Sequence, residues 1–159
     1  MQFKTLLENH YLRILKAALG YMGELETARE AAHEAMLRAY LARESYDETR
    51  PFYPWMYRIV KHTCIDRKRR LAKKSSYVEG HHESAAASPL HQLEQRECQR
   101  RLMLALGCLT EEHREVLNLR HFQDLSYQEI AETLEISQGT VMSRLYRARK
   151  SLHNQMKEL

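Results

Sequence analysis

Arginine and lysine side chains gather near the C-terminus, in the stretch LSYQEIAETLEISQGTVMSRLYRARKSL (residues 125–152). Its first half mixes acidic and apolar residues, whereas its second half ends in Arg144, Arg147, Arg149 and Lys150 and has no carboxylate. Guanidinium and ammonium groups bind phosphate, and a guanidinium also pairs with the edge of a base. This change of charge within one short stretch predicts a surface that binds a polyanion.

Two short helices joined by a tight turn are the elements that must position these cations. Ser126 is a suitable N-cap for a first helix ending at Leu134, and Ser137 is a suitable N-cap for the second. Because only residues 135–137 lie between them, the two helices must cross closely and form a helix-turn-helix. Glu135 stands where such turns often hold glycine for a positive φ, so either this residue costs about 1 kcal/mol or the turn is shifted. The expected shared core is Ile130, Ala131, Leu134, Ile136, Val141 and Leu145.

The second helix presents polar and basic side chains to the outside, whereas the first carries Glu129 and Glu132. A helix in the DNA major groove must offer donors to base edges and phosphates, while the supporting helix faces solvent and tolerates carboxylates. The N-terminus capped by Ser137 also directs backbone N–H groups toward a phosphate. An ordinary helical hairpin with a solvated basic face is the alternative, and the short turn and one-sided charge favour DNA binding. The outward face is Gln138, Thr140, Met142, Ser143, Arg144, Tyr146 and Arg147.

A second basic helix is expected over residues 55–74, with Pro54 in its first turn. Eight cations accompany one acid in this segment. A solvated helix end would also explain this charge, but the aromatic residues at its start and Tyr46 in the preceding loop could stack on unpaired bases. For Phe52 and Trp55, packing in the core is the favoured interpretation. The residues expected to face inward are Trp55, Ile59 and Ile65.

The remaining segments are also typical of helices. Apolar residues at spacings of three and four predict one helix over residues 3–22 and another, with an alanine-rich stripe, over residues 25–42. Helical spacing resumes over residues 90–107, and Thr110 is a suitable N-cap for a further helix whose apolar side includes Phe122.

The segment SSYVEGHHESAAASP is small, polar and without periodicity, which predicts a flexible linker. We therefore expect an all-α protein made of two small helical domains, residues 1–74 and 90–159, joined by a linker over residues 75–89. The C-terminal domain contains the helix-turn-helix.

The remaining motifs argue against catalysis and metal binding. The sequence has no Gly-rich phosphate loop, Ser-His-Asp arrangement or paired carboxylates, so an enzyme is not expected. His33 and Glu34 lack the second histidine of an HExxH site. His81 and His82 fall in the expected linker, where no rigid geometry would hold a ligand set. Neither a metal nor another cofactor is therefore expected.

Hydropathy and cysteine content indicate a cytoplasmic protein. No run of 18 apolar residues occurs and the N-terminal stretch carries a charge every few residues, so neither membrane insertion nor secretion is expected. Cys64, Cys98 and Cys108 are odd in number and form no CxxC pair, which predicts reduced thiols. The net charge of +4 is only a mild bias, so the distribution of charge is more informative than its sum.

Two segments, RPFYPWMYRIVKHTCIDRKRR and LTEEHREVLNLRHFQDLSYQEIAETLEISQGTVMSRLYRARKSL, together resemble bacterial RNA polymerase sigma factors of the extracytoplasmic function (ECF) group, and the resemblance covers residues 3–155. These proteins keep only sigma regions 2 and 4. In the family, region 2 binds the clamp helices of the polymerase β′ subunit and captures the unpaired −10 element. Region 4 binds the β flap and reads the duplex −35 element. The resemblance implies the same partners here, together with an anti-sigma factor.

Carried over by position, these roles fall on three sets of residues. The polymerase-binding set is His33, Glu34, Leu37 and Arg38. The −10 set is Tyr46, Asp47, Arg58, Lys61, His62 and Arg67. The −35 set is Ser137, Gln138, Gly139, Thr140, Ser143, Arg144, Arg147, Arg149 and Lys150.

The sequence also departs from the family pattern. Residues 30–34 read EAAHE where relatives more commonly have Asp-Leu-Val-Gln-Glu, which predicts a weaker or differently packed clamp contact. His62 stands where an asparagine is often found. The alternative function is a stand-alone helix-turn-helix regulator whose N-terminal domain senses a ligand or dimerises. The basic, aromatic end of the N-terminal half favours the sigma factor.

Overall fold

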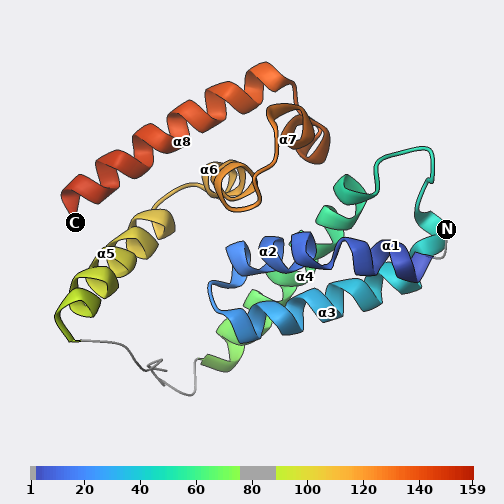
Figure 1. Cartoon of the computed structure of the whole chain (residues 1–159), viewed down its shortest axis with the longest axis horizontal. Coiled ribbons are helices and arrows are strands. Elements are labelled where there is room, and N and C mark those ends of the chain that lie inside the picture. Colours follow the sequence, from blue (N-terminus) through green and yellow to red (C-terminus); the bar gives the residue numbers. More distant parts are fainter. Residues whose placement is uncertain (1–2, 76–88) are drawn as a thin grey trace.

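The computed structural model describes residues 3–75 and 89–159, and these residues form helices and turns without a strand (Figure 1). The prediction of an all-α fold is therefore confirmed. Most of the expected linker, including His81 and His82, lies outside the described residues.

The N-terminal half is a small helical bundle in which α1 and α2 lie against α3 and α4. The prediction of a single helix over residues 3–22 was wrong, because this segment forms two helices separated at His10. The φ and ψ of His10 are −100° and 2°. The ring Nδ1 of His10 lies 2.9 Å from the carbonyl oxygen of Leu6, which stabilises the break. The bounds are α1 Phe3–Asn9, α2 Tyr11–Met22, α3 Leu25–Leu41 and α4 Phe52–Ser75.

Small side chains on α3 allow this bundle to pack closely. The alanines of the predicted stripe are fully buried together with Ala31, whereas Met36 of that stripe is half-buried, and this face packs on α2 and α4. Gly23 ends α2 with φ of +79°, a conformation that glycine adopts without a steric cost, so the chain reverses into α3 within a few residues. The buried alanines are Ala28, Ala31, Ala32, Ala35 and Ala39.

The inward face of α4 differs from the prediction. Met56, Val60 and Cys64 are fully buried, whereas the expected inward residues Trp55, Ile59 and Ile65 are only half-buried. Helix α4 contacts α2, α3 and α7. The face of α4 that is buried against these helices is therefore rotated away from the face predicted from its large apolar residues.

The C-terminal half contains the expected helix-turn-helix and one feature that the sequence did not suggest. Thr110 caps α6, as predicted, and its Oγ1 accepts a hydrogen bond from the His113 N–H at 3.3 Å. After Leu117 the chain widens into a π-helical turn. The extra residue in a π turn rotates the side chains that come after it, and Phe122, expected on the apolar side, is 43% exposed. The bounds are α5 Pro89–Gly107, α6 Glu111–Leu117, η2 Asn118–Phe122, α7 Tyr127–Leu134 and α8 Gln138–Glu158.

The two halves pack against each other. Helix α2 contacts η2, α4 contacts α7, and one hydrophobic cluster runs through both halves. Figure 1 shows α7 above the N-terminal bundle and α8 lying across the top of the C-terminal half. Nothing in the sequence pattern indicated this contact.

Candidate nucleic-acid and partner interfaces

Helix α7 begins at a reciprocal cap. The Ser126 Oγ accepts a hydrogen bond from the Glu129 N–H at 3.1 Å, and the Glu129 carboxylate accepts one from the Ser126 N–H at 2.9 Å. The hydrogen bond from the Ser126 backbone lowers the pKa of Glu129, despite partial burial, and Arg13 adds to this. A capping box of this kind fixes the start of the helix, as the sequence predicted at Ser126.

The turn between α7 and α8 has a left-handed conformation at Glu135. Glu135 has φ of 55° and ψ of 45°, and shortly after it the Ser137 Oγ accepts a hydrogen bond from the Thr140 N–H at 3.1 Å. Ile130, Val141 and Leu145 are buried between the helices. Both caps are therefore confirmed, and so is the core at Ile130, Ala131, Val141 and Leu145, whereas Leu134 and Ile136 are only half-buried against it.

Helix α8 separates an apolar face from a polar one. Val141, Leu145 and Ala148 are buried, and most residues of the −35 set lie on the opposite side. Thr140 and Arg144 are half-buried at the margin. The exposed members of the −35 set are Ser137, Gln138, Gly139, Ser143, Arg147, Arg149 and Lys150.

The arginines on α8 are held by neighbouring groups. Arg147 donates to the Ser143 carbonyl oxygen at 3.3 Å, and Arg149 donates to His121 Nε2 at 3.3 Å. Burial lowers the pKa of His121, and the nearby guanidinium of Arg149 lowers it further, so a neutral ring accepts this hydrogen bond at physiological pH. Arg144 forms an ion pair with Glu112 of α6 at 3.5 Å.

The loop before α4 is fixed by its own contacts. The ring of Tyr46 packs against Phe52 and Trp55, with centroid distances of 5.4 and 5.2 Å, and its hydroxyl donates to the Arg50 carbonyl oxygen at 2.8 Å. The hydroxyl and N–H of Thr49 donate to Asp47 and lower its pKa. Tyr46 and Asp47 thus lie on a structured loop beside an aromatic cluster.

The cations of the −10 set do not gather around this loop. Arg58 forms an ion pair with Glu135, Lys61 donates to Glu115 at 2.8 Å, and Arg67 pairs with acids of α3. Arg58, Lys61, His62 and Arg144 instead line a cleft of about 510 Å³ between the two halves.

Two of the aromatic residues considered for base stacking are not accessible in this arrangement. Tyr53 and Tyr57 are 5% and 1% exposed and form hydrogen bonds across the contact between the halves. The suggestion that they stack on bases is therefore not supported in this conformation. Phe52 is buried, as favoured from the sequence.

The polymerase-binding set divides into a charged pair and an exposed apolar surface. Glu34 accepts hydrogen bonds from Arg38 at 2.8 Å and from Arg70 at 2.9 Å, and Arg38 also pairs with Asp66. Partial desolvation opposes ionisation of Glu34, but these guanidinium groups lower its pKa overall. Leu37, in contrast, is 60% exposed.

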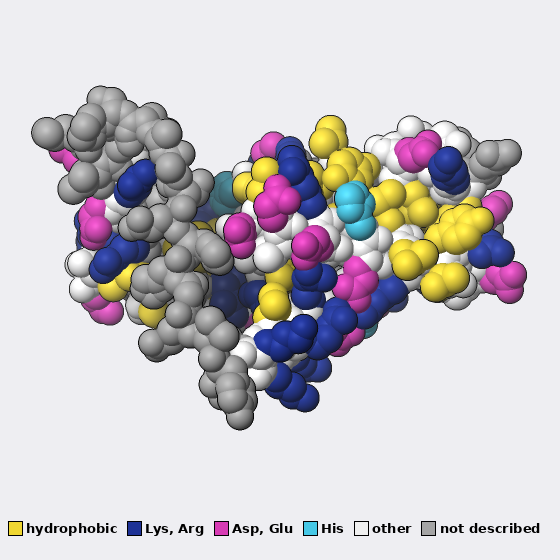
Figure 2. Space-filling view, turned by 90° about the horizontal axis from the view of Figure 1, so that it is seen from below, with side chains coloured by type: hydrophobic (Ala, Val, Ile, Leu, Met, Phe, Trp, Pro, Cys, Tyr) yellow, Lys and Arg dark blue, Asp and Glu magenta, His cyan; other side chains and the backbone are white. Residues whose placement is uncertain are grey.

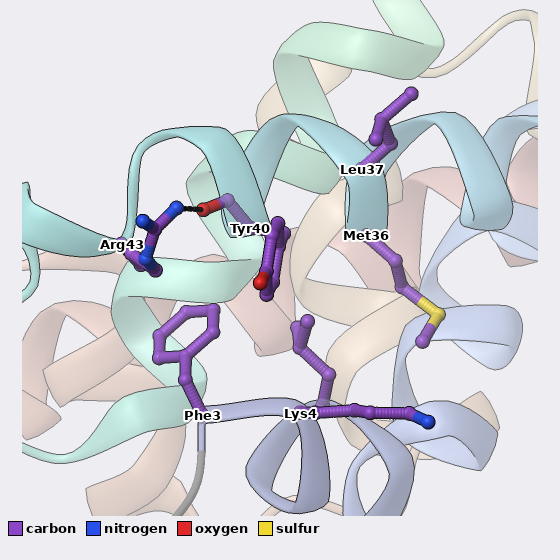
Figure 3. A pocket seen from close by; sticks show the side chains of 7 residues that line it. Phe3, Lys4, Met36, Leu37, Tyr40 and Arg43 are labelled. Atoms are coloured by element: carbon purple, nitrogen blue, oxygen red, sulfur yellow. Dashed lines mark hydrogen bonds between the residues drawn. The ribbon is translucent and has the colours of Figure 1, made fainter.

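Leu37 belongs to a larger apolar surface on α1 and α3. A shallow groove of about 630 Å³ runs beside it, with Met36 and Tyr40 on one wall and Phe3 on the other (Figure 3). Leu41, just beyond Tyr40, is 71% exposed. Figure 2 shows hydrophobic side chains gathered over this end of the molecule, with a separate band of Lys and Arg beside them. His33, one turn before Leu37, is exposed and stacks on Tyr11.

A polar cluster centred on Glu115 was not predicted from the sequence. This residue is 7% exposed, and its carboxylate accepts hydrogen bonds from Tyr21, Tyr57 and Lys61 of the other half. A signal was present, because Glu115 directly precedes Val116 and Leu117 on the buried side of α6. A carboxylate on a buried face requires partners, which the sequence alone could not identify.

Within residues 3–75 and 89–159, no group of three His, Cys, Asp or Glu side chains is arranged to hold a metal ion. Over the same residues, no helix is both long and apolar enough to cross a bilayer. Cys64 is a buried thiol, whereas Cys98 and Cys108 are exposed.

Comparison with known proteins connects the two halves with one family. Residues 6–74 match sigma-70 region 2, and residues 99–152 match sigma-70 region 4. The chain is 29% identical to RNA polymerase sigma-H factor of Pseudomonas aeruginosa, over 99% of this chain and 87% of that protein. It is 32% identical to RNA polymerase sigma factor YlaC of Bacillus subtilis, over 98% and 95% of the two chains.

A solved structure agrees with this assignment at the level of the fold. CnrH, in complex with the cytosolic domain of CnrY, superimposes with a TM-score of 0.69 and 23% identity, over 98% of this chain and 88% of that one. The chain is also 30% identical to the ECF RNA polymerase sigma-E factor of Haemophilus influenzae, over 82% of this chain and 75% of that protein. The region 2 and region 4 matches and these similarities lead to one conclusion: the chain belongs to the sigma-70 family of RNA polymerase sigma factors, in its ECF group.

Proposed function

We propose that this ECF sigma factor directs promoter recognition with residues 1–74 as region 2, residues 75–89 as a linker and residues 90–159 as region 4. The chain would bind core RNA polymerase and place both regions on promoter DNA. The observation that carries the proposal is the polar, basic face of α8, positioned by a capped helix-turn-helix.

Region 4 would read the duplex −35 element with α8 in the major groove. Gln138, Ser143, Arg144 and Arg147 carry donors suited to base edges, and each good pairing is worth about 1 to 3 kcal/mol of discrimination. Ser137 and Gly139, at the helix N-terminus, would contact a phosphate through the backbone. Arg149 and Lys150, farther along the helix, would add contacts to phosphate that do not depend on sequence.

Region 2 would bind the −10 element as a separated strand. Tyr46 and Asp47 would hold a flipped base beside the aromatic cluster, and His62 would contact the strand from α4. Arg58, Lys61 and Arg67 would neutralise its phosphates. Melting would then be assisted because the protein binds the open strand more tightly than the duplex, and no energy source is required.

Core polymerase would be held through two contacts. Leu37 and the apolar groove beside it suit a helical partner such as the β′ clamp helices, with His33, Glu34 and Arg38 at its edge. The β flap would bind region 4. We also propose an anti-sigma factor as a partner, since the sigma factor RpoE of Bartonella quintana, which shares this fold, was solved in complex with the anti-sigma factor NepR.

The mechanism would consist of binding and placement, without bond chemistry, metal or cofactor. The chain would work in the cytoplasm, where RNA polymerase transcribes. The alternative, a stand-alone helix-turn-helix regulator, is not favoured, because the region 2 match covers the N-terminal half, where a sensor domain would lie.

Run-off transcription from a promoter library, with purified core polymerase and the chain, tests this function. We expect transcripts from a subset of promoters that share −35 and −10 sequences, and none from core polymerase alone. Footprinting on promoter DNA without polymerase distinguishes a sigma factor from a stand-alone helix-turn-helix regulator. A regulator would protect a two-fold symmetric site by itself, and that result, together with no transcription, would overturn the proposal.

A further inference from the structure

Met142 and Tyr146 form an apolar pair on the outward face of α8, and neither residue belongs to the −35 set. Their side chains are 57% and 68% exposed. They are four residues apart, so they are neighbours on one face of the helix. Each comes directly after a residue buried in the core of the helix-turn-helix, Val141 or Leu145, so the packing that buries the core also exposes the pair.

The polar side chains on either side of this pair are bound within the chain. Ser143 accepts hydrogen bonds from Arg147 at its carbonyl oxygen and at its hydroxyl, both at 3.3 Å. On the other side of the pair, by helical spacing, Arg149 donates to His121 Nε2 at 3.3 Å. An apolar strip thus lies between two guanidinium groups. Single exposed apolar residues are common, but two that adjoin within a basic face indicate a contact surface.

Gly139 leaves open space near the start of this strip, three residues before Met142. A Cβ built at Gly139 would have the Ser137 Oγ, at 3.8 Å, as its nearest neighbour, which is an ordinary van der Waals distance. Packing within the chain therefore does not require glycine here, although glycine is less favourable in a helix than alanine. The missing side chain allows another molecule to approach the backbone of α8 closely.

The major groove of DNA offers an apolar group that fits this strip. Each base pair presents hydrogen-bond donors and acceptors there, and thymine adds a methyl group. Met142 and Tyr146 are about 6 Å apart along the axis of α8, at about 1.5 Å per residue. This separation corresponds to about two base pairs at about 3.4 Å each. The pair can therefore reach methyl groups on neighbouring base pairs when the helix lies in the groove.

We propose that Met142 and Tyr146 are specificity-determining residues that bind thymine methyl groups in the −35 element. The inference rests on the proposed function, because it requires α8 in the major groove. Polar base edges placed against the strip would lose water without gaining a hydrogen bond, so the pair would favour A·T over G·C base pairs at these positions. A protein is the competing occupant of the strip. The flanking guanidinium groups favour DNA, because they complement phosphates on both sides.

Removal of single methyl groups from promoter DNA tests the inference with holoenzyme. A promoter obtained from the run-off library is made as duplex fragments, in which each −35 thymine on either strand is replaced in turn by deoxyuridine. Deoxyuridine lacks only the methyl group and keeps the hydrogen-bonding groups of the base. Fluorescence anisotropy at fixed salt gives the Kd of holoenzyme for each fragment, and the ratio of the deoxyuridine Kd to the thymidine Kd isolates the methyl group.

Wild-type holoenzyme should bind about fourfold more weakly when a methyl group in contact with the strip is removed. Met142→Ala and Tyr146→Ala should each bring this ratio close to one at a position where the wild type is sensitive. Tyr146→Phe keeps the ring and should keep the wild-type ratio. Met103→Ala, at a methionine of α5 that is 51% exposed, is the matched control and should retain every ratio.

Comparison of ratios also separates methyl recognition from other roles of the pair. A double-mutant cycle between the side chain and the methyl group cancels any general change in affinity that a substitution causes. An equal loss of affinity for thymidine and deoxyuridine fragments in Met142→Ala and Tyr146→Ala would place the pair against phosphate or against polymerase. A wild-type ratio near one at every thymine, or a selected −35 element without thymine, would exclude the inference.

Failure of the proposed function gives a different result. If core polymerase with the wild-type chain selected no −35 sequence, region 4 would not read the promoter and the inference would fail with it. If the holoenzyme selected a −35 sequence but was insensitive to the methyl groups, only the inference would fail.

Discussion

Arg58 of α4 forms an ion pair with Glu135, the residue that turns the chain between α7 and α8. Their side chains are 50% and 64% exposed, so the pair contributes only about 0 to 1 kcal/mol to stability. Its position is more informative than its energy, because it joins a cation assigned to the −10 strand to the turn that positions the −35 helix. The two proposed DNA sites are therefore in contact in this conformation.

Glu135→Gly should be neutral or stabilising by up to about 1 kcal/mol, because glycine adopts the left-handed conformation without a steric cost. Its φ of 55° is the reason to expect this sign. Glu132→Gly, the same substitution inside α7, should destabilise the protein by about 1 kcal/mol. Urea unfolding of both variants measures the difference, and an equal loss of stability in the two would contradict the role of the turn.

Arg144→Ala and Lys150→Ala should affect promoter recognition differently. Arg144→Ala should relax discrimination at one −35 base pair by about 1 to 3 kcal/mol, because a base contact is lost. Lys150→Ala should weaken all promoters about equally and reduce the slope of log affinity against log salt by about 0.9. Binding of holoenzyme to promoter variants at several salt concentrations measures both. Lys157→Ala, in the last turn of α8, is the control. A uniform loss from both variants would exclude Arg144 as a reader of bases.

Leu37→Glu should weaken binding to core polymerase at least about tenfold, because it places a charge in an apolar contact. The free energy of unfolding of Leu37→Glu should differ little from that of the wild type, because Leu37 is 60% exposed. Leu12→Glu on α2 is the matched control, because Leu12 is 70% exposed and lies outside the groove. Fluorescence anisotropy with labelled sigma factor and core polymerase gives both affinities. Equal affinities would place the polymerase contact elsewhere.

Glu34→Gln should destabilise the protein at neutral pH but not in acid. The pKa of Glu34 is lowered in the folded state from its ordinary value of 4.5, by Arg70 and Arg38 against the opposing effect of burial. Its contribution to stability is therefore fully present above pH 4.5 and is lost as the pH falls through the lowered pKa.

The free energy of unfolding in urea at pH 7 and at pH 3 measures this effect. The gap between wild type and Glu34→Gln should shrink at pH 3. Glu8→Gln serves as the control, because Glu8 is exposed and its nearest cation, Lys4, is 3.8 Å away. A gap that persists unchanged at pH 3 would show that the carboxylate charge is not what stabilises α3 against α4.

Local sequence signals were sufficient to predict most of the helices and the helix-turn-helix. Ser126, Ser137 and Thr110 cap helices because short polar side chains satisfy N–H groups that no preceding turn can reach. The sequence left open whether Glu135 would take a positive φ or the turn would shift, and the structure shows the positive φ. Periodicity did not show the interruption at His10 or the π turn over Asn118–Phe122, because neither changes the spacing of apolar residues enough to be seen in the sequence.

The sequence by itself determined which side chains α8 exposes, because helical periodicity and the buried stripe depend on residue order. Only the tertiary structure decided that Glu115 meets Tyr21, Tyr57 and Lys61, and that Arg58 meets Glu135. These contacts join residues more than 35 positions apart, and no local pattern specifies which distant surface a buried carboxylate or an exposed cation will meet. Their partners depend on how the two halves pack, which is a property of the whole folded chain.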